Sequence, residues 1–237
     1  MAWLRTSVTA AAALAMTGVF ARAADMPGYP SPPAPDYRSA LLDFNAGWYL
    51  RGDIGGRWGQ LTGVQSATPL PNPTDSSLGQ GITGGLGVGF KSTWLRTDVT
   101  VDYASPLNYR GTLASAGDTT AKIQATTALV NGYVDLGNWY RVSPYIGGGA
   151  GVAYTHVFDF ATSPPFSGDT SRAQWNFAWA GMAGIAFAVS HNLMMDAGYR
   201  YLNIGDVNTG AMTFRNVAAH EVHIGLRWSF NDLHDPN

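Results

Sequence analysis

Residues 48–58 alternate between apolar and polar positions along their whole length. Even positions are Trp, Leu, Gly or Ile, whereas the odd positions include Arg51, Asp53 and Arg57. Alternate side chains of a β-strand point to opposite faces, so this segment predicts a strand with one apolar and one charged face. The apolar face begins and ends in tryptophan. Aromatic residues at both ends of an apolar face are typical of strands that cross a membrane with that face toward lipid.

The same alternation recurs in seven later segments of about ten residues, the length that a tilted strand needs to cross a bilayer. The eight predicted strands cover residues 48–58, 81–90, 94–103, 121–136, 142–155, 173–189, 193–202 and 220–230. Within 121–136 the polar residues change face, and we expect a β-bulge near Ala128 to reconcile the two halves. Strands in lipid must pair all their backbone groups, and a closed barrel does so without leaving an edge.

The connections between the eight segments alternate in length along the chain. Three are tight turns, at residues 91–93, 137–141 and 190–192. Four are long, at residues 59–80, 104–120, 156–172 and 203–219. Membrane barrels have short periplasmic turns and longer extracellular loops. The sequence therefore predicts an all-β fold, an eight-stranded antiparallel up-and-down transmembrane β-barrel over residues 46–230, with mobile loops outside the cell.

Both ends of the chain are predicted to lie outside the barrel. Residues 1–23 are typical of a cleaved secretory signal peptide, with Arg5 before an apolar core and a small-residue cleavage motif at 21–23. Residues 24–45 contain five prolines within a short span and predict an extended periplasmic linker. Residues 231–237 are predicted to form a C-terminal periplasmic tail.

Composition supports a lipid-facing surface. The chain of 237 residues contains 29 glycines and 29 aromatic residues, and only 13% of its residues are charged, against about 25% in average proteins. The absence of cysteine excludes a disulfide scaffold and a thiolate metal site. Without residues 1–23 the chain keeps 12 basic and 16 acidic residues, a net charge of −4, which gives no indication of nucleic-acid binding.

The predicted inward face carries as many basic as acidic side chains. Eight strands enclose an interior just wide enough for side chains, and unpaired charges buried there would be costly. We therefore expect a lumen filled by salt bridges; the alternative is a narrow, gated pore lined by the same residues. The ten lumen residues are Arg51, Asp53, Arg57, Arg96, Asp98, Asp102, Asp196, Arg200, Glu221 and Arg227.

The predicted outward face carries aromatic residues near the strand ends. Tryptophan and tyrosine collect at membrane–water interfaces because their rings are amphipathic, so we expect them to form two interface girdles. These residues are Trp48, Trp58, Trp175, Trp179, Tyr199, Tyr201 and Trp228.

Two motifs suggest chemistry but do not carry it. The segment His220-Glu221-Val222-His223 is one residue shorter than the zinc motif His-Glu-x-x-His, and on a strand its two histidines point to opposite faces. The glycine-rich runs at 85–89 and 147–151 lack the Lys-Ser/Thr of a phosphate-binding loop and do not open a helix. We expect no metal site and no bound cofactor.

Four segments carry a family resemblance, namely Asn131-Gly-Tyr133-Val-Asp135, residues 144–149, residues 196–201 and residues 221–230. In their order and spacing they resemble the alphaproteobacterial small outer-membrane β-barrel proteins of the 25/31-kDa surface-antigen family. That family is related to opacity proteins and to the barrel half of OmpA-type proteins. The resemblance covers about residues 46–230.

The resemblance implies an outer-membrane location, surface-exposed loops and a role in envelope integrity. It implies contacts with outer-membrane lipids and lipopolysaccharide, and with the barrel-assembly machinery, which recognises a C-terminal aromatic that corresponds to Phe230. In this chain residues 231–237 follow that aromatic. Some family members are porin-like, and others bind haemin or a host ligand through their loops. His156 and Tyr109 are predicted near the outer rim and are the candidate iron ligands.

Small outer-membrane barrels can also be enzymes that act on lipid A. The deacylase type resembles a lipid-facing His-x-Ser pair with an acidic residue on a neighbouring strand. None of the five histidines of this chain has serine two residues later. We therefore expect no enzymatic activity.

Overall fold

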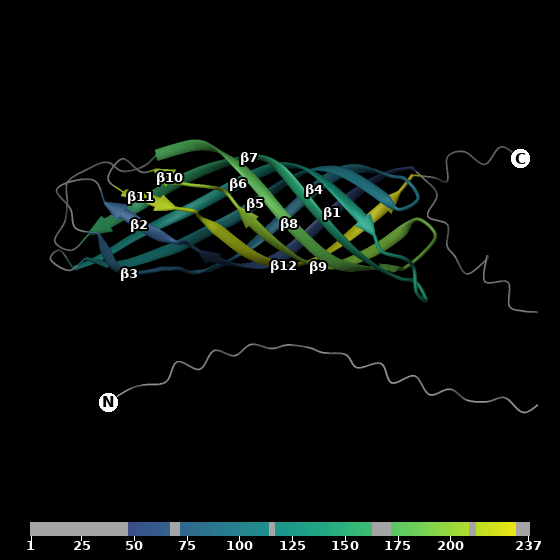
Figure 1. The fold of residues 1–237 in the computed structure, drawn as a ribbon, viewed down its shortest axis with the longest axis horizontal. Coiled ribbons are helices and arrows are strands. Elements are labelled where there is room, and N and C mark those ends of the chain that lie inside the picture. The colour runs from purple at the N-terminus through teal and green to yellow at the C-terminus, as the bar shows by residue number, and fades with distance from the viewer. Residues whose placement is uncertain (1–46, 67–71, 114–116, 163–171, 209–211, 231–237) are drawn as a thin grey trace, which may run out of the picture. The chain divides into compact units, whose positions relative to one another are not determined.

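The computed structural model describes residues 47–66, 72–113, 117–162, 172–208 and 212–230, and their regular elements are β-strands (Figure 1). The described residues include no helix with the length and hydropathy needed to cross a membrane. The predicted signal peptide, linker and C-terminal tail lie outside these residues. The barrel strands are β1 (Gly47–Gln60), β4 (Gln80–Lys91), β5 (Leu95–Leu113), β6 (Gly117–Asp135), β7 (Val142–Thr162), β8 (Arg172–Ala188), β9 (Leu193–Asn203) and β12 (Ala218–Ser229).

These eight strands close into an antiparallel barrel, which confirms the predicted fold class. Each strand pairs with its neighbours in chain order, and β1 pairs with β12 to complete the ring. At one end of the barrel the Phe230 amide donates to the Trp48 carbonyl oxygen at 3.1 Å. The three short turns, at residues 92–94, 136–141 and 189–192, lie at this same end because the strands alternate in direction.

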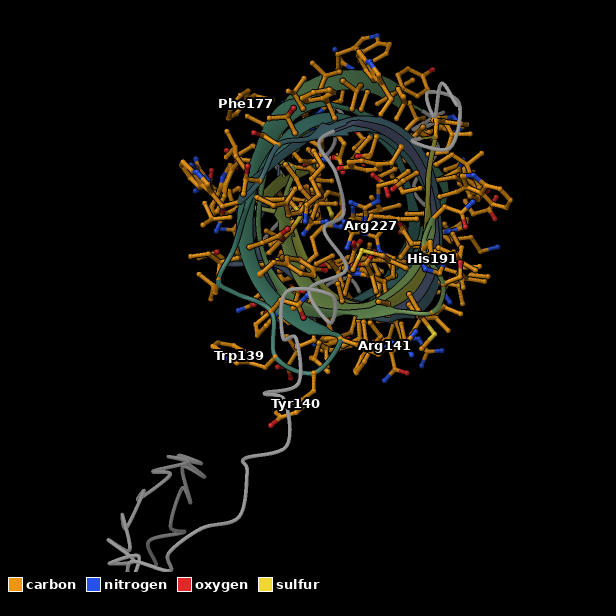
Figure 2. The ribbon with its side chains drawn as sticks, turned by 90° about the vertical axis from the view of Figure 1, so that its right-hand side faces the viewer. Trp139, Tyr140, Arg141, Phe177, His191 and Arg227 are labelled. Carbon is orange, nitrogen blue, oxygen red and sulfur yellow. The ribbon has the colours of Figure 1, made fainter. Side chains whose placement is uncertain are left out.

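Side chains alternate between the two faces of the barrel wall as the sequence predicts. Ile54, Leu86 and Ile224 point outward and are exposed, whereas Arg57, Glu221 and Arg227 point inward and are buried. Viewed from the end with the short turns, Phe177 lies outside the ring of strands and Arg227 lies within it (Figure 2). We use the name membrane band for the part of the eight barrel strands in which apolar residues lie outside and charged residues lie inside.

The β-bulge expected near Ala128 is not found. Ala128 pairs with Val101 and with Val152 in an unbroken register. Odd-numbered side chains from Thr119 to Tyr133 all point inward, so Lys122 faces outward with its even-numbered neighbours. The change of polarity that suggested a bulge arises because β6 continues beyond the apolar exterior.

The expected loops at 59–80, 104–120 and 203–219 are largely strand. β5 and β6 together leave only residues 114–116 between them, and β3 (Pro73–Leu78) pairs with the upper end of β5. A separate three-stranded sheet contains β2 (Gly63–Ser66), β10 (Val207–Asn208) and β11 (Met212–Arg215). We call these four short strands, with the adjoining ends of β5, β6, β7 and β8, the extension; it lies opposite the short turns (Figure 1).

Polarity is reversed in the extension. Leu107, Ile123 and Val157 point inward and are buried, whereas Arg110 and Lys122 point outward and are exposed. An antiparallel sheet in water buries its apolar face in this way. The reversal begins near a register shift in β5 between Ala104 and Leu107. The extension is therefore built for water and the membrane band for lipid.

A polar turn bends the chain after β9 into the mouth of the barrel. Gly205 has a φ of 71° and donates its amide to Asn203 Oδ1 at 2.9 Å. Asn216 has a φ of 51°, and its amide donates to Asp206 Oδ1 at 2.8 Å. Glycine and asparagine are the residues that adopt this left-handed conformation most readily. The bend places residues 204–208 and 212–217 over the barrel interior, where Ile204, Val207 and Phe214 join the buried core.

Candidate functional site

One cluster of the lumen is centred on the carboxylate of Asp98, which is buried on β5. It accepts hydrogen bonds from Tyr49 Oη at 2.9 Å, Arg51 Nη1 at 3.1 Å and Asn131 Nδ2 at 2.8 Å. Arg51 also donates to Asp53 Oδ2 at 3.0 Å. Charge-assisted hydrogen bonds of this kind are about twice as strong as neutral ones, so the cluster ties β1, β5 and β6 together.

A second cluster surrounds Arg96, whose side chain is almost completely buried. Its guanidinium carbon lies 4.7 Å from the ring centroids of both Tyr133 and Tyr145, within the range of cation–π attraction. Its Nε donates to Asp135 Oδ1 at 2.9 Å, and Lys91 Nζ donates to Asp135 Oδ2 at 2.8 Å. These side chains fill the barrel at the end with the short turns.

A bidentate pair joins β9 to β12. Arg227 donates to Asp196 through Nε at 2.5 Å and through Nη2 at 2.9 Å, and both side chains are buried. The parallel geometry of guanidinium and carboxylate makes such pairs strong and directional.

The fourth cluster spans the lumen from one wall to the other. Arg200 Nε donates to Glu221 Oε2 at 2.6 Å, and Arg200 Nη1 lies 3.1 Å from Asp102 Oδ1 on the opposite wall. Arg57 Nε lies 3.8 Å from Glu221 Oε1, which is an ion pair without a hydrogen bond. This cluster is the last charged layer before the extension.

All ten predicted lumen residues point inward, and each lies within 4 Å of an oppositely charged group. Asp135, the partner of Arg96, was not predicted as a lumen residue, although it alternates in phase with Asn131 and Tyr133. The buried tyrosine hydroxyls and rings were not predicted either, because a tyrosine in an apolar alternation gives no sign of which charge it contacts.

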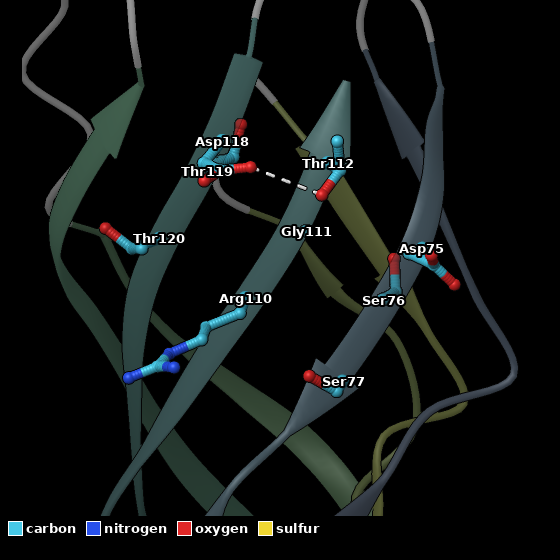
Figure 3. A pocket seen from close by; sticks show the side chains of 9 residues that line it. All are labelled: Asp75, Ser76, Ser77, Arg110, Gly111, Thr112, Asp118, Thr119 and Thr120. Atoms are coloured by element: carbon cyan, nitrogen blue, oxygen red, sulfur yellow. Dashed lines mark hydrogen bonds between the residues drawn. The ribbon is translucent and has the colours of Figure 1, made fainter. Parts of the chain in front are cut away.

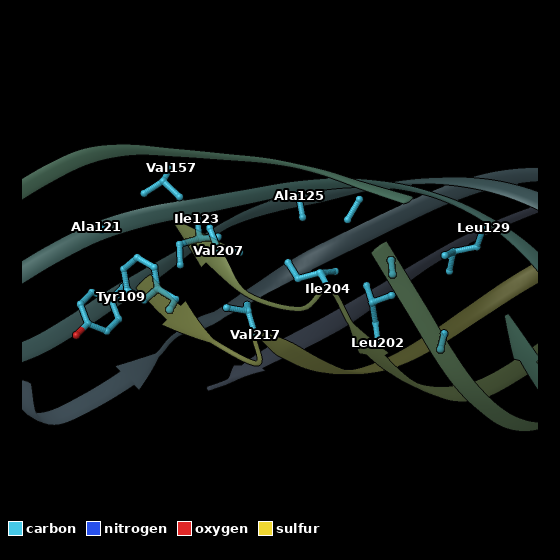
Figure 4. Packing of buried hydrophobic residues seen from close by; sticks show 14 of the residues in the cluster. Tyr109, Ala121, Ile123, Ala125, Leu129, Val157, Leu202, Ile204, Val207 and Val217 are labelled. Carbon is cyan, nitrogen blue, oxygen red and sulfur yellow. The ribbon is translucent and has the colours of Figure 1, made fainter. Parts of the chain in front are cut away.

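Beyond the charged layers, the barrel interior is filled by apolar side chains that we call the apolar plug (Figure 4). Phe214 of β11 is fully buried and packs edge-on against Tyr109, with ring centroids 4.8 Å apart. Tyr109 Oη lies 3.2 Å from Ser76 Oγ, and burial raises the pKa of the Tyr109 hydroxyl above its ordinary value. The plug also contains Val64, Ala121, Ile123, Ala153, Val157, Ile204, Val207, Met212 and Val217.

The structure is a closed barrel with a charged interior and an apolar exterior, and the sequence matches one described family along most of its length. The family model for the outer membrane protein beta-barrel domain matches residues 11–230. The chain belongs to this family. It is an outer-membrane β-barrel protein of the Gram-negative envelope, as the sequence resemblance implies.

Relatives of this outer-membrane barrel agree in extent. An uncharacterized protein of Brucella abortus is 32% identical over 198 residues, which is 69% of this chain and 70% of the relative. A putative adhesin of Rickettsia bellii is 26% identical over 215 residues, covering 82% of this chain and 90% of the relative. The crystal structure of the Pseudomonas aeruginosa outer membrane protein OprG shares the fold, with a TM-score of 0.54 and 18% identity over 80% of this chain and 99% of that chain.

Aromatic side chains lie at both ends of the membrane band of this outer-membrane barrel. Trp48 contacts Phe90 at the periplasmic end, with ring centroids 5.6 Å apart. Of the predicted girdle residues, Tyr201 is partly buried and the others are exposed on the exterior. Exposed Trp94 and Trp139 add to the periplasmic end and were not predicted. Trp94 opens the predicted strand 94–103 on the same face as the inward Arg96, but in the structure it precedes β5, and Trp139 lies in a predicted turn. In Figure 2 Trp139 lies at the rim nearest the viewer.

The two candidate iron ligands do not share a site. Tyr109 is buried in the apolar plug, whereas His156 points outward and stacks on Phe158 with ring centroids 5.3 Å apart. His220 and His223 likewise lie on opposite faces of β12, as their spacing predicts. In the described ranges, no three metal-binding side chains come together.

The outer face of the extension carries a polar pocket of about 510 Å³ between β3, β5 and β6 (Figure 3). The exposed side chains of Ser77, Arg110 and Thr120 line it, and Thr112 Oγ1 donates to Asp118 Oδ1 at its rim at 3.3 Å. The pocket presents hydroxyl groups, one guanidinium and the carboxylates of Asp75 and Asp118 to the surroundings of the cell.

Proposed function

We propose that this protein is a non-enzymatic, non-conducting outer-membrane barrel that contributes to envelope integrity and presents its extension to the outside. The observation that carries the proposal is that two kinds of side chain fill successive parts of the barrel interior. The charged clusters occupy the membrane band, and the apolar plug occupies the extension beyond them.

The contacts inside the lumen support a closed path. Arg200 reaches Asp102 from the opposite wall, and Arg51 reaches Asp98 past the intervening strand β4. Side chains that meet across the lumen obstruct a continuous water column. Apolar constrictions also stop ions by excluding water, so the plug is a second barrier in series with the first.

Planar-bilayer conductance of the refolded mature chain is the direct test. We expect no channels from the parent protein, and none from Arg51→Ala, because the apolar plug stays in place when one ion pair is lost. Steady ohmic channels in the parent, with an ion selectivity that changes in Arg51→Ala, would establish the alternative of a narrow porin.

The structural role and the porin role predict different changes in solute uptake when the protein is removed from its host cell. A strain that lacks a structural barrel is expected to take up more of a large apolar dye, because the envelope is less well sealed. Expression of the parent or of Arg51→Ala is expected to reverse this uptake equally. Loss of a porin would instead reduce the uptake of small polar solutes and leave the entry of the apolar dye unchanged.

A further inference from the structure

Three polar side chains form a hydrogen-bonded chain on the exterior of the barrel, at the upper edge of the membrane band. Tyr199 Oη lies 2.5 Å from His220 Nδ1, and His220 Nε2 lies 2.8 Å from Gln60 Oε1. Because an amide oxygen only accepts hydrogen bonds, His220 Nε2 donates to Gln60 Oε1, and His220 Nδ1 shares a hydrogen bond with the Tyr199 hydroxyl. The three residues come from β9, β12 and β1, which are adjacent.

Aromatic rings surround this chain and stay open to the membrane. Trp58 stacks on His220 with ring centroids 6.0 Å apart and an angle of 15°, and Tyr201 packs edge-on against His220 at 5.3 Å. Trp179 extends the surface beside Tyr201. Trp58 is 42% exposed and Trp179 is 44% exposed. We call these six side chains the His220 platform; its flat rings with polar edges match the apolar faces and hydroxyl rims of sugar rings.

An apolar groove of about 520 Å³ lies below the platform on the same strands and on β4. Gly52, Ile54, Leu86, Met195, Ile224 and Leu226 line it. Gly56 lies between the groove and Trp58 on the outward face, and a side chain added there would meet open space. The groove and the platform are therefore continuous along the exterior of β1.

The dimensions correspond to one membrane leaflet. Gly52 and Trp58 are six residues apart, which is about 20 Å along a strand and about 14 Å of depth at a tilt of about 45°. Half of the hydrocarbon core of a bilayer is about 15 Å deep. A lipid with acyl chains in the groove would thus place its headgroup on the His220 platform.

We propose that this face of β1, β9 and β12 is a docking site for one lipopolysaccharide molecule of the outer leaflet. The acyl chains of its lipid A lie along Gly52 and Gly56, and a glucosamine ring of lipid A stacks on the His220 platform. A glycerophospholipid would fill the groove equally well, but its headgroup contains no ring to stack. The proposal extends the role in envelope integrity, because a barrel that holds lipopolysaccharide stabilises the leaflet around it.

The exposed cation nearest to this site in the sequence is Arg215, at the end of β11, above the start of β12. Its Nη2 donates to Gln65 Oε1 at 2.6 Å, and among the described residues it has no acidic partner. The sugar of lipid A carries phosphate groups. A guanidinium above the platform supplies charge complementary to those groups.

Native mass spectrometry of the full mature chain in detergent micelles, titrated with lipid A or with phosphatidylethanolamine, tests the site. The two informative variants are His220→Ala, which removes the centre of the platform, and Gly56→Leu, which puts a side chain between the groove and the platform. Matched controls are His156→Ala, an outward histidine on β7, and Gly132→Leu, an outward glycine on β6 that also has open space around it.

We expect the parent to bind one lipid A with at least about a tenfold preference over phosphatidylethanolamine, and each informative variant to lose about tenfold in affinity for lipid A. The controls are expected to bind like the parent. Equal binding of both lipids, or equal losses in the informative and control variants, would overturn the proposal. Because the readout is lipid binding, the result stands whether or not the lumen conducts ions.

Discussion

Asp196→Ala is expected to lower the free energy of unfolding by about 3–5 kcal/mol, because it leaves a buried arginine without its counter-charge. In the native barrel Arg227 is buried and makes two hydrogen bonds to Asp196. The measurement is equilibrium unfolding in urea of the barrel refolded into lipid vesicles, followed by tryptophan fluorescence.

Lys122→Ala is the matched control for this substitution, because the φ of 52° at Asp159 would add backbone strain to an alanine there. Asp159 pairs with Lys122 at 2.8 Å, but their side chains are 59% and 45% exposed, and ion pairs of this kind contribute about 0–1 kcal/mol. Replacing both partners, as in Asp196→Leu with Arg227→Met, is expected to restore most of the stability, since no unpaired charge remains. Equal losses from Asp196→Ala and Lys122→Ala would show that the lumen is hydrated and that its charges are screened.

Phe214→Ala is expected to cost about 3–5 kcal/mol by opening a cavity in the apolar plug. Phe214 is fully buried and joins the sheet of β2, β10 and β11 to Tyr109 on β5. Its loss should loosen that sheet while the membrane band keeps its own contacts. Urea unfolding measures the stability, and limited proteolysis of the folded protein is expected to cut the extension faster.

Phe158→Ala provides the comparison for the plug. Phe158 also lies in the extension, but on its outer face and only partly buried. Its removal is expected to cost about 1 kcal/mol, the typical effect of a substitution outside the core. If the two variants were equally stable and equally resistant to protease, the apolar plug would not hold the extension together.

The membrane band could be predicted from the sequence because lipid imposes a strict rule on each strand. Residues 48–58 and 220–230 alternate without a break, and the ends of β1 and β12 differ from those limits by only one or two residues. The faces were predictable for the same reason: a charge such as Asp98 has no alternative to the lumen when the other face meets hydrocarbon.

The extension could not be predicted because its strands obey the opposite rule. Leu107 and Tyr109 face inward while Asn108 and Arg110 face outward, so a search for apolar residues on the outside reads the segment as a loop. The register shift after Ala104 also breaks the alternation of β5 at the border between the two environments. Within a few residues the apolar side chains move from the outer to the inner face and the alternation shifts by one position, so no single period can be detected.

The charged residues of the lumen could be predicted individually but not as pairs. Arg200 and Asp102 lie on opposite walls, and their contact depends on strand tilt and on the length of the arginine side chain. The His220 platform was not predicted either. Its members come from four strands, and in the sequence each reads only as one more aromatic or polar residue at the end of a strand.

The pairing of β1 with β12 has a consequence for how the protein is made. Among the barrel strands, β12 is the last to leave the ribosome and to be exported, so β1 keeps an unpaired edge until β12 arrives. Unpaired edges invite aggregation, and contacts between residues far apart in the sequence form slowly. A nearly full-length chain must therefore be kept soluble during export. A premature stop before residue 218 would yield an open sheet with two unpaired, aggregation-prone edges instead of a smaller barrel.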